Sequence, residues 1–189
     1  MTDTAISRII DVNGKTAKTY DNLFTFDERR LFYNFALGSY YKMIGNDGIA
    51  TASENNQYQI SSKYDQNDVL AMGFFVGENI NKVLKDNGCS LDRVKQCRVN
   101  CSHLGEKNVV HSDGKGKTLL YCLNINWRPQ WGGHLMLMNE DATDPLEIIG
   151  YVSGRVSVFD GDIPHCVMTP TVMSPFHRLT LAVQFNDVH

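Results

Sequence analysis

The amino-acid sequence predicts a mainly β domain of the α+β class, with a jelly-roll sandwich or barrel braced by helices from the N-terminal half. The chain has 189 residues, which is the usual length of one domain with a sizeable core. Apolar residues recur at helical spacing in the first half, whereas the period shifts towards two from Val94 onward. Short apolar runs then alternate with Gly, Pro, Asp and Asn, which is typical of jelly rolls and barrels. We therefore expect a single domain over 1–189, with supporting elements over 1–93 and the β core over 94–186.

Two supporting elements are expected near the N-terminus. Asn13-Gly14 is a favoured two-residue turn between the runs Ile9–Val12 and Lys18–Phe24, which predicts a small hairpin. The segment Thr25–Glu28 has the form of a capping box and predicts the start of a helix. Apolar residues follow it at helical spacing: Leu31, Phe32 and Phe35. We expect this helix to run to about Ile44.

A second helix is expected from Asp68 to the stop signal Asn87-Gly88. Its apolar residues form one stripe: Val69, Met72, Val76, Ile80 and Val83. Such stripes indicate packing, so we expect both helices to cover one outer face of the sheet. The polar segment Asn46–Lys63 predicts a long loop or an irregular strand. Because long loops are often functional, we expect a lid there, with Tyr58 and Tyr64 as candidate substrate contacts.

The β core is expected to contain seven strands, with turn residues between most of them. The expected ranges are 97–102, Thr118–Asn124, His134–Met138, Glu147–Val152, Arg155–Phe159, Cys166–Met168 and Leu179–Phe185. Composition and period alone do not separate a jelly roll from other β folds.

Composition argues against several classes of function. The formal net charge is −3 and no basic run stands out, so we expect neither a nucleic-acid partner nor a membrane surface. No apolar stretch has the length needed to span a bilayer, and Met1–Thr4 is too polar for a secretory signal. The five cysteines are odd in number and include no Cys-x-x-Cys pair, which favours free thiols in a reducing compartment. We expect a cytoplasmic location.

The chemistry is concentrated in four residues of the β core. His111 and Asp113 are two positions apart, so on a strand both side chains point to the same side and reach one ion. His165 follows a turn rich in Gly, Asp and Pro and offers a third ligand. Two histidines and one carboxylate occupy one face of a ferrous ion and leave the other face open for oxygen chemistry. Arg178 begins the last apolar strand, where a cation is costly unless it meets an anion.

Further motifs stand around these residues in a definite order. They are Leu123-Asn124, Trp127, Trp131–Leu135, Gly154–Val156, Phe159–Gly161, Pro164-His165 and Arg178-x-Thr180. With His111-x-Asp113, they make the stretch from about Arg98 to Phe185 resemble the iron(II)- and 2-oxoglutarate-dependent dioxygenases, in the prolyl 4-hydroxylase-like branch. The resemblance implies a double-stranded β-helix core.

The resemblance also implies the roles of individual residues. His111, Asp113 and His165 would bind Fe(II), and Arg178 would pair with the distal carboxylate of 2-oxoglutarate. Three further residues would line the cosubstrate pocket: Thr180, Leu120 and Cys122. The implied reaction uses O2 to decarboxylate 2-oxoglutarate to succinate and CO2 and hydroxylates a C–H bond. Halogenating relatives lack the carboxylate ligand, so Asp113 favours oxygen insertion. Ascorbate is expected as a reductant that slows oxidative damage to the thiols near the site.

Two positions depart from the family pattern. Ser102 and Cys122 stand where many members have tyrosines that line the cosubstrate pocket, so we expect different hydrogen bonding there. Two further residues carry two interpretations each. Trp127 either shapes a substrate groove or packs the sheet edge, and Asp160 (or Asp162) either orients His165 or is only a polar turn residue.

Several alternatives remain open at the level of sequence. A cupin-like metal enzyme has a similar barrel but brings extra histidines to its metal, and a non-catalytic binding module is expected to lose a ligand. Gln184 stands six residues after Arg178, where nucleic-acid demethylases of the superfamily carry a second arginine, which argues against that class. The substrate is a peptide, a protein or a small molecule, with peptidyl proline as one candidate. The sequence does not determine the oligomeric state.

Overall fold

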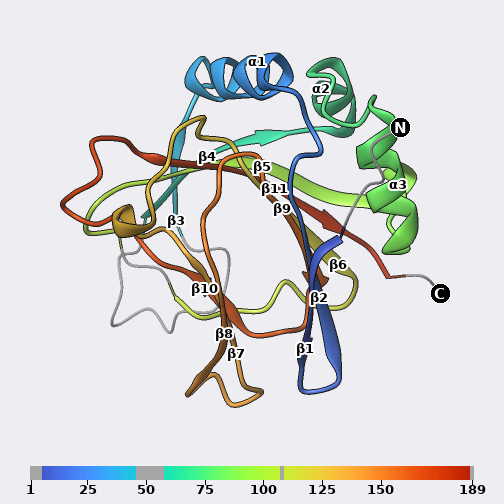
Figure 1. Cartoon of the computed structure of the whole chain (residues 1–189), viewed down its shortest axis with the longest axis vertical. Coiled ribbons are helices and arrows are strands. Elements are labelled where there is room, and N and C mark those ends of the chain that lie inside the picture. The colour runs from blue at the N-terminus through green and yellow to red at the C-terminus, as the bar shows by residue number, and fades with distance from the viewer. Residues whose placement is uncertain (1–5, 46–57, 107–108, 188–189) are drawn as a thin grey trace.

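The computed structural model describes residues 6–45, 58–106 and 109–187. In these ranges the strands form two antiparallel sheets, with an eight-stranded order β1-β2-β9-β6-β11-β5-β4-β3 and a three-stranded order β10-β7-β8 (Figure 1). The larger sheet contains β1 (Ile6–Val12), β2 (Lys15–Tyr20), β3 (Lys42–Gly45), β4 (Tyr58–Tyr64), β5 (Val94–Ser102), β6 (Lys117–Cys122), β9 (Val156–Asp160) and β11 (Arg178–Phe185). The smaller sheet contains β7 (Leu135–Met138), β8 (Pro145–Ile149) and β10 (His165–Val167).

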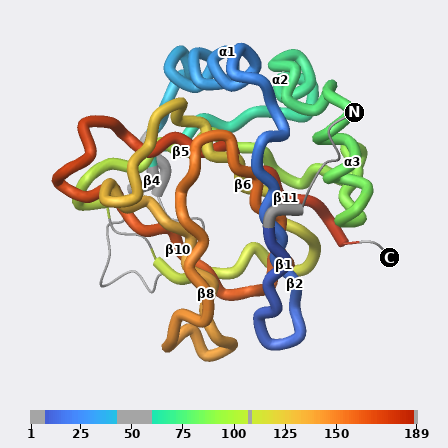
Figure 2. Tube along the Cα trace, viewed as in Figure 1, coloured from blue at the N-terminus to red at the C-terminus, as the bar shows by residue number. Residues whose placement is uncertain are grey.

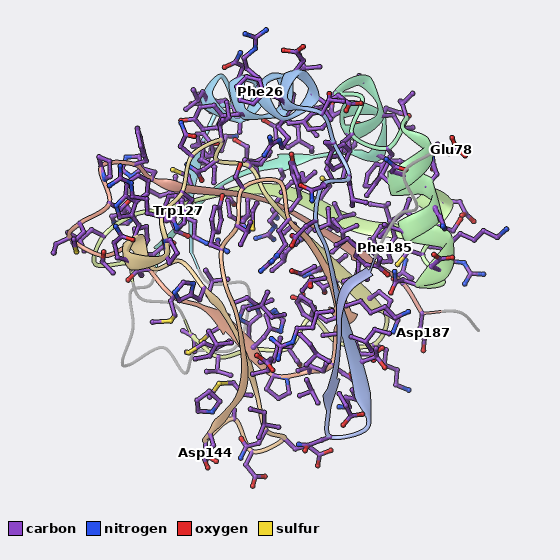
Figure 3. The ribbon with its side chains drawn as sticks, in the orientation of Figure 1. Phe26, Glu78, Trp127, Asp144, Phe185 and Asp187 are labelled. Carbon is purple, nitrogen blue, oxygen red and sulfur yellow. The ribbon has the colours of Figure 1, made fainter. Side chains whose placement is uncertain are left out.

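The helices lie together on one side of the larger sheet (Figures 1 and 2). They are α1 (Phe26–Leu37), α2 (Gln66–Ala71) and α3 (Glu78–Asp86), and two short 3₁₀ turns are η1 (Leu91–Arg93) and η2 (Pro129–Trp131). Figure 3 shows side chains filling the space between these helices and the sheet, while Phe26 and Glu78 lie at the outer rim. None of the helices in the described ranges is long and apolar enough to cross a membrane.

Two apolar cores fill the spaces between these layers. The larger core joins residues of the helices, such as Phe32 and Ile80, to the outer face of the large sheet, represented by Leu181. The smaller core lies between the two sheets, where Ile10 packs with Leu137 and other residues. The predicted fold class is therefore confirmed: the chain is mainly β, with a double-stranded β-helix core braced by helices.

The predicted hairpin is confirmed, and so is the start of the first helix. Asn13 and Gly14 both have positive φ (54° and 78°), as the tight turn requires, and Val12 pairs with Lys15. Thr25 and Glu28 form the expected reciprocal capping box.

The first helix ends earlier than expected. It ends at Leu37 rather than near Ile44, because the chain after Gly38 turns and forms β3. This strand pairs with β4 at the edge of the large sheet, so tertiary pairing overrides the helical pattern of the sequence.

The second expected helix is wrong as a single element, because it is divided into α2 and α3. Gly73 adopts φ +81°, a left-handed conformation that prevents α2 from continuing. The break places Phe74 in the core, with its ring 5.5 Å from Phe32 and 5.0 Å from Tyr121. Val76, which the single-helix prediction placed on the buried stripe, is 70% exposed.

The polar segment Asn46–Lys63 is divided between described and undescribed residues. Residues 46–57, which include most of the expected lid, lie outside the described ranges, as does the side chain of Tyr58. The remainder belongs to β4, which pairs with β5. Tyr64 packs against Phe35 of α1, with ring centroids 5.1 Å apart, so it faces the helices.

The break between α2 and α3 leads to a stability prediction. Phe74→Ala should lower the free energy of unfolding by about 3–5 kcal/mol, because it removes a fully buried ring from an aromatic cluster. Val76→Ala should change that free energy by no more than about 0.5 kcal/mol, because Val76 is exposed. Urea unfolding of both variants measures the difference. Equal destabilisation by the two substitutions would contradict the divided helix.

Candidate metal centre and cosubstrate pocket

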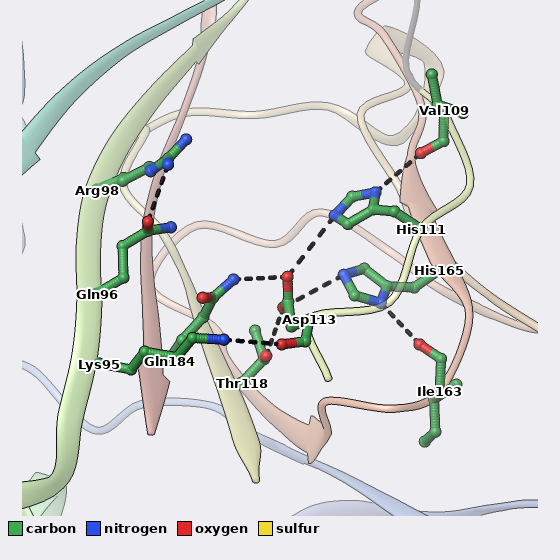
Figure 4. A network of polar contacts seen from close by, with 10 residues as sticks. All are labelled: Lys95, Gln96, Arg98, Val109, His111, Asp113, Thr118, Ile163, His165 and Gln184. Carbon is green, nitrogen blue, oxygen red and sulfur yellow. Dashed lines mark hydrogen bonds and ion pairs between the residues drawn. The ribbon is translucent and has the colours of Figure 1, made fainter. Parts of the chain in front are cut away.

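Two backbone hydrogen bonds bring the metal-ligand candidates together. His111 donates its amide to the carbonyl of His165 (2.9 Å), and His165 donates to the carbonyl of His111 (2.8 Å). The amide of Asp113 donates to the carbonyl of Gly161 (2.7 Å), so the His-x-Asp segment lies along the turn that precedes β10. One ligand atom of His111, Asp113 and His165 each lies within 4.8 Å of the others (Figure 4).

Both imidazole rings are held in the orientation that metal binding needs. Nδ1 of His111 lies 2.9 Å from the carbonyl oxygen of Val109, and Nδ1 of His165 lies 2.8 Å from that of Ile163. Donation from Nδ1 leaves Nε2 as the acceptor atom on each ring, and both Nε2 atoms face Asp113, at 3.8 and 3.6 Å. Burial lowers the pKa of His165, which favours the neutral ring that binds metal.

Of the two interpretations of Asp160 and Asp162, the contacts do not support an orienting role for His165, whose Nδ1 is bonded to the carbonyl of Ile163. Asp160 instead accepts from the backbone amide of Thr16 (2.8 Å) and forms an ion pair with Lys117 (2.5 Å). Asp162 pairs with Lys15 at 3.1 Å. A backbone carbonyl takes the orienting role because the turn places Ile163 directly beside the ring.

Asp113 is held at both carboxylate oxygens. The hydroxyl of Thr118 donates to Oδ2 (2.5 Å), and the amide Nε2 of Gln184 donates to Oδ1 (2.6 Å) (Figure 4). Lys95 adds a contact from its ammonium group to the backbone carbonyl of Asp113 (3.2 Å). The sequence interpretation missed Thr118 and Gln184 as supports. The sequence did contain an indication of Gln184: it lies six positions after Arg178, and residues an even number of positions apart on a strand point to the same face.

The three candidate ligands leave one side of the cluster accessible. The side chain of His111 is 51% exposed, whereas those of Asp113 and His165 are 11% and 5% exposed. Two imidazoles and one carboxylate suit a ferrous ion with open coordination positions, so the donor set fits that metal. Among the described residues no further histidine, cysteine or carboxylate joins this group.

Arg178 occupies a buried position on the inner face of β11. It is 3% exposed, and its Nε donates to the carbonyl of Gly133 (2.8 Å) while Nη1 donates to the hydroxyl of Thr180 (3.1 Å). The guanidinium lies over the ring of Tyr151, 4.9 Å from its centroid. Burial lowers the pKa of Arg178, so charging this group there is costly. The carboxylate of Glu106 acts on Arg178 only through its charge, and no carboxylate among the described residues forms a direct ion pair with the guanidinium, so this position suits an anionic ligand.

The other expected pocket residues lie on the same sheet face. Cys122 pairs with Thr180 across β6 and β11, and Leu120 pairs with Ala182. Burial raises the pKa of Cys122 to about 11, so it is a neutral thiol near pH 7. Ser102 is buried and lies opposite Arg178 in the β5–β11 ladder.

Trp127 packs against Tyr151, whose ring lies beneath the guanidinium of Arg178. Its ring lies 4.7 Å from Tyr151 and 5.6 Å from Trp131, and its Nε1 donates to the carbonyl of Gly132 (3.0 Å). Tyr151 itself was missed by the sequence interpretation. Its buried hydroxyl lies 2.7 Å from Oδ1 of Asn124. Its ring contacts the guanidinium of Arg178 and packs against the ring of Trp127.

No family sequence model matches this chain, and no characterised protein matches it by sequence. Solved structures do match it. A prolyl hydroxylase from Trichoplax adhaerens, solved with a peptide fragment of the hypoxia inducible factor oxygen degradation domain, is 17% identical, with a TM-score of 0.61 over 90% of this chain and 83% of that chain. An oxidoreductase of the 2OG-Fe(II) oxygenase family from Burkholderia pseudomallei is 11% identical, with a TM-score of 0.66 over 90% and 84%.

This chain has the fold of the 2-oxoglutarate and iron(II) oxygenases. The same fold occurs in a non-haem α-ketoglutarate-dependent epimerase from nogalamycin biosynthesis, which is 10% identical with a TM-score of 0.63 over 90% of this chain and 78% of that chain. Fold alone therefore does not select the reaction, which depends on the residues of the site.

Gln184 leads to a prediction about metal affinity. Gln184→Leu should weaken Fe(II) binding about 10- to 100-fold, because removing a partner that orients a ligand typically costs that much. Gln96→Leu is the matched control, since Gln96 lies opposite Gln184 in the ladder but donates nothing to Asp113. Anaerobic metal titration measures both. Equal affinities for the Gln184 variant and the wild type would remove Gln184 from the site.

Gly133 leads to a prediction about the anion pocket. A Cβ at this position would lie 2.9 Å from Cδ of Arg178, so Gly133→Ala should displace the guanidinium and weaken 2-oxoglutarate binding. The control is Gly14→Ala, which has a similar φ of +78° but no atom within 4 Å of the added carbon. Isothermal titration of 2-oxoglutarate into each metal-loaded variant measures the effect. An unchanged affinity in Gly133→Ala would show that Arg178 does not contact the cosubstrate.

Proposed function

We propose that this chain is an Fe(II)- and 2-oxoglutarate-dependent dioxygenase that hydroxylates a C–H bond. The observation that carries the proposal is the cluster of His111, Asp113 and His165 together with a buried Arg178 on β11, the strand whose Gln184 donates to Asp113. The cluster fits a ferrous ion, and the guanidinium fits the distal carboxylate of a 2-oxo acid. Bound iron would couple the oxidative decarboxylation of 2-oxoglutarate by O2, which yields succinate and CO2, to hydroxylation of the substrate.

The protein residues hold and orient the reacting groups. The carbonyls of Val109 and Ile163 keep each Nε2 directed at the metal position. Thr118 and Gln184 hold the carboxylate of Asp113 in the same direction. These contacts place the three ligands before any metal binds, which reduces the reorganisation that binding requires.

Arg178 and its neighbours orient the cosubstrate. The bonds to Gly133 and Thr180 fix the guanidinium plane, and the ring of Tyr151 supports it from one side. A carboxylate bound there would align the oxo acid along β11 towards the metal position. Cys122 and Leu120 supply a neutral wall on β6. The neutral thiol of Cys122 does not repel a carboxylate.

Neither alternative class is favoured by the site. Cupin-like enzymes bring extra histidines, yet His134 accepts a hydrogen bond from the amide of Tyr151 instead (3.4 Å). Among the described residues, only two histidines join the metal cluster. A non-catalytic module is expected to lose a ligand, whereas this chain retains all three and Arg178.

The substrate class of the proposed reaction is a peptide, a protein or a small molecule. A peptidyl proline is supported by the prolyl hydroxylase among the structural neighbours, which was solved with a peptide. The five cysteines are all free thiols, which supports a reducing location such as the cytoplasm and a role for ascorbate in protecting the enzyme.

The proposal is tested by anaerobic titration of the purified chain with Fe(II) and then 2-oxoglutarate. We expect a visible charge-transfer band, which should disappear on exposure to O2 as succinate forms. Asp113→Ala should abolish the band. Arg178→Ala should weaken 2-oxoglutarate binding by about 2–5 kcal/mol, the cost of truncating a buried charge pair.

The control is Arg8→Ala, which removes an exposed arginine paired with Glu147 at the protein surface. It should leave the band and the 2-oxoglutarate requirement unchanged. Iron binding without the band in the wild-type chain would reject the cosubstrate assignment.

A further inference from the structure

Two buried polar atoms lie beside the site without a hydrogen-bond partner in the described part of the chain. They are Oγ of Ser61 on β4 and Oδ1 of Asn100 on β5. The two residues are directly opposite each other in the antiparallel ladder, so their side chains are on the same face. Ser61 is only 1% exposed. Because buried polar atoms are nearly always hydrogen-bonded to protein, water or a ligand, this pair indicates a binding position.

The register of the sheet places this pair on the inner face. Asn100 lies opposite Thr180, whose hydroxyl accepts from Arg178. The intervening residue Val99 faces outward into the helix-side core. Ser61 and Asn100 are therefore on the sheet face that carries Arg178, Thr180 and Gln184, the last of which donates to Asp113.

A buried cation stands next to the pair on the same wall. Arg98 is two residues before Asn100 on β5 and is 8% exposed. Its Nη2 donates to Oε1 of Gln96 (2.8 Å). Figure 4 shows Arg98 and Gln96 extending from β5 on the side where Gln184 contacts Asp113. Arg98 and Gln184 therefore project from the same face of the sheet.

This group of residues borders the expected cosubstrate position at Thr180, which lies opposite Asn100, and extends from there to β4. The neutral pocket residues Cys122 and Leu120 are on β6, which borders β11 on one side. Asn100 and Ser61 are on β5 and β4, which lie on the other side of β11. With neighbouring strands about 4.8 Å apart, β4 lies roughly 10 Å from β11. A cosubstrate held between the metal and Arg178 would leave this part of the wall for a second ligand.

The chemistry of the three side chains defines that ligand. A guanidinium recognises a carboxylate through its planar fork of donors. The Oδ1 atom of Asn100 accepts from an N–H or O–H group, and the hydroxyl of Ser61 both donates and accepts. A carboxylate beside an N–H donor is the pattern of a free α-amino acid. A residue within a peptide chain carries no carboxylate on its backbone.

We propose that Arg98, Asn100 and Ser61 bind the primary substrate, and that this substrate is a free α-amino acid or a closely similar small carboxylate. Arg98 holds the carboxylate, and Asn100 with Ser61 receives the amino group. The inference rests on the proposed function for its catalytic meaning, although binding itself requires no turnover. It selects a small metabolite over a peptidyl proline.

The experiment measures ligand binding by NMR to the full chain loaded with Zn(II) and 2-oxoglutarate. The probes are the free proteinogenic amino acids at millimolar concentration, with their N-acetyl carboxamides as blocked counterparts. At least one free amino acid should bind, and its blocked counterpart should not. Asn100→Ala, Ser61→Ala and Arg98→Gln should each weaken that binding about tenfold or more, because each removes a hydrogen-bonding group.

Ser62→Ala is the matched control. Ser62 is adjacent to Ser61 on the same strand, but its hydroxyl donates to the carbonyl of Tyr40 and it pairs with the outward-facing Val99. This variant should bind the amino acid as the wild type does. Circular dichroism of each variant identifies any loss of fold.

The outcomes separate this inference from the proposed function. The Fe(II)–2-oxoglutarate band, recorded on the same variants, should persist in Asn100→Ala while amino-acid binding is lost. If no free amino acid binds the wild type, or if the blocked counterparts bind equally well, the substrate assignment is overturned whatever the band shows. Binding that is unchanged in all three variants would mean that only ordered water occupies the pair. Loss of the band from the wild type would reject the proposed function alone.

Discussion

The alternation of side chains along β11 is the constraint on which the rest of the structure depends. Leu179, Leu181 and Val183 face the helices, whereas Arg178, Thr180 and Gln184 face the interior of the β-helix. A shift of one residue in the register with β5 or β6 would exchange these two sets. It would place a guanidinium in the apolar core and expose leucines to the site. The buried outer face therefore holds the functional residues in register.

The site itself depends on how its buried charges are satisfied. The carboxylate of Asp113 receives a donor at each oxygen, and the guanidinium of Arg178 meets a carbonyl, a hydroxyl and an aromatic face. These contacts compensate part of the cost of removing charge from water. Some binding capacity remains: the Nε2 atoms of both histidines face the metal position, and Arg178 forms no direct ion pair with a carboxylate among the described residues. Apolar residues of similar volume at these positions would often stabilise the fold as well or better, so the buried charges indicate a role in binding.

The same reasoning extends along the inner wall to β4 and β5. Packing in the helix-side core does not account for Ser61 and Asn100, because that core is on the opposite face of the sheet. Their unsatisfied atoms next to Arg98 are costly unless water or a ligand binds them. Arg178 and this pair are on the same inner face of the large sheet, and Gln184 of that face reaches the metal cluster through Asp113.

The sequence by itself determined the features that depend on short spacings. The fold class, the Asn13-Gly14 turn and the capping box at Thr25 were predictable because each is encoded within a few neighbouring residues. The metal-ligand candidates were predictable because His111 and Asp113 are two positions apart. His165 and Arg178 were also singled out from their local sequence, and the resemblance supplied the roles expected of them. The structure brings His165 to His111 and Asp113 and buries Arg178 on β11.

Tertiary structure alone decided the features that depend on pairing between distant segments. The first helix ends at Leu37 because β3 pairs with β4, and the second is divided because Phe74 joins the aromatic core. The supports of Asp113 and the Ser61–Asn100 pair exist only through the register of strands that are far apart in the chain. A local pattern states which face a residue takes, but only the assembled sheet states which residues stand opposite one another.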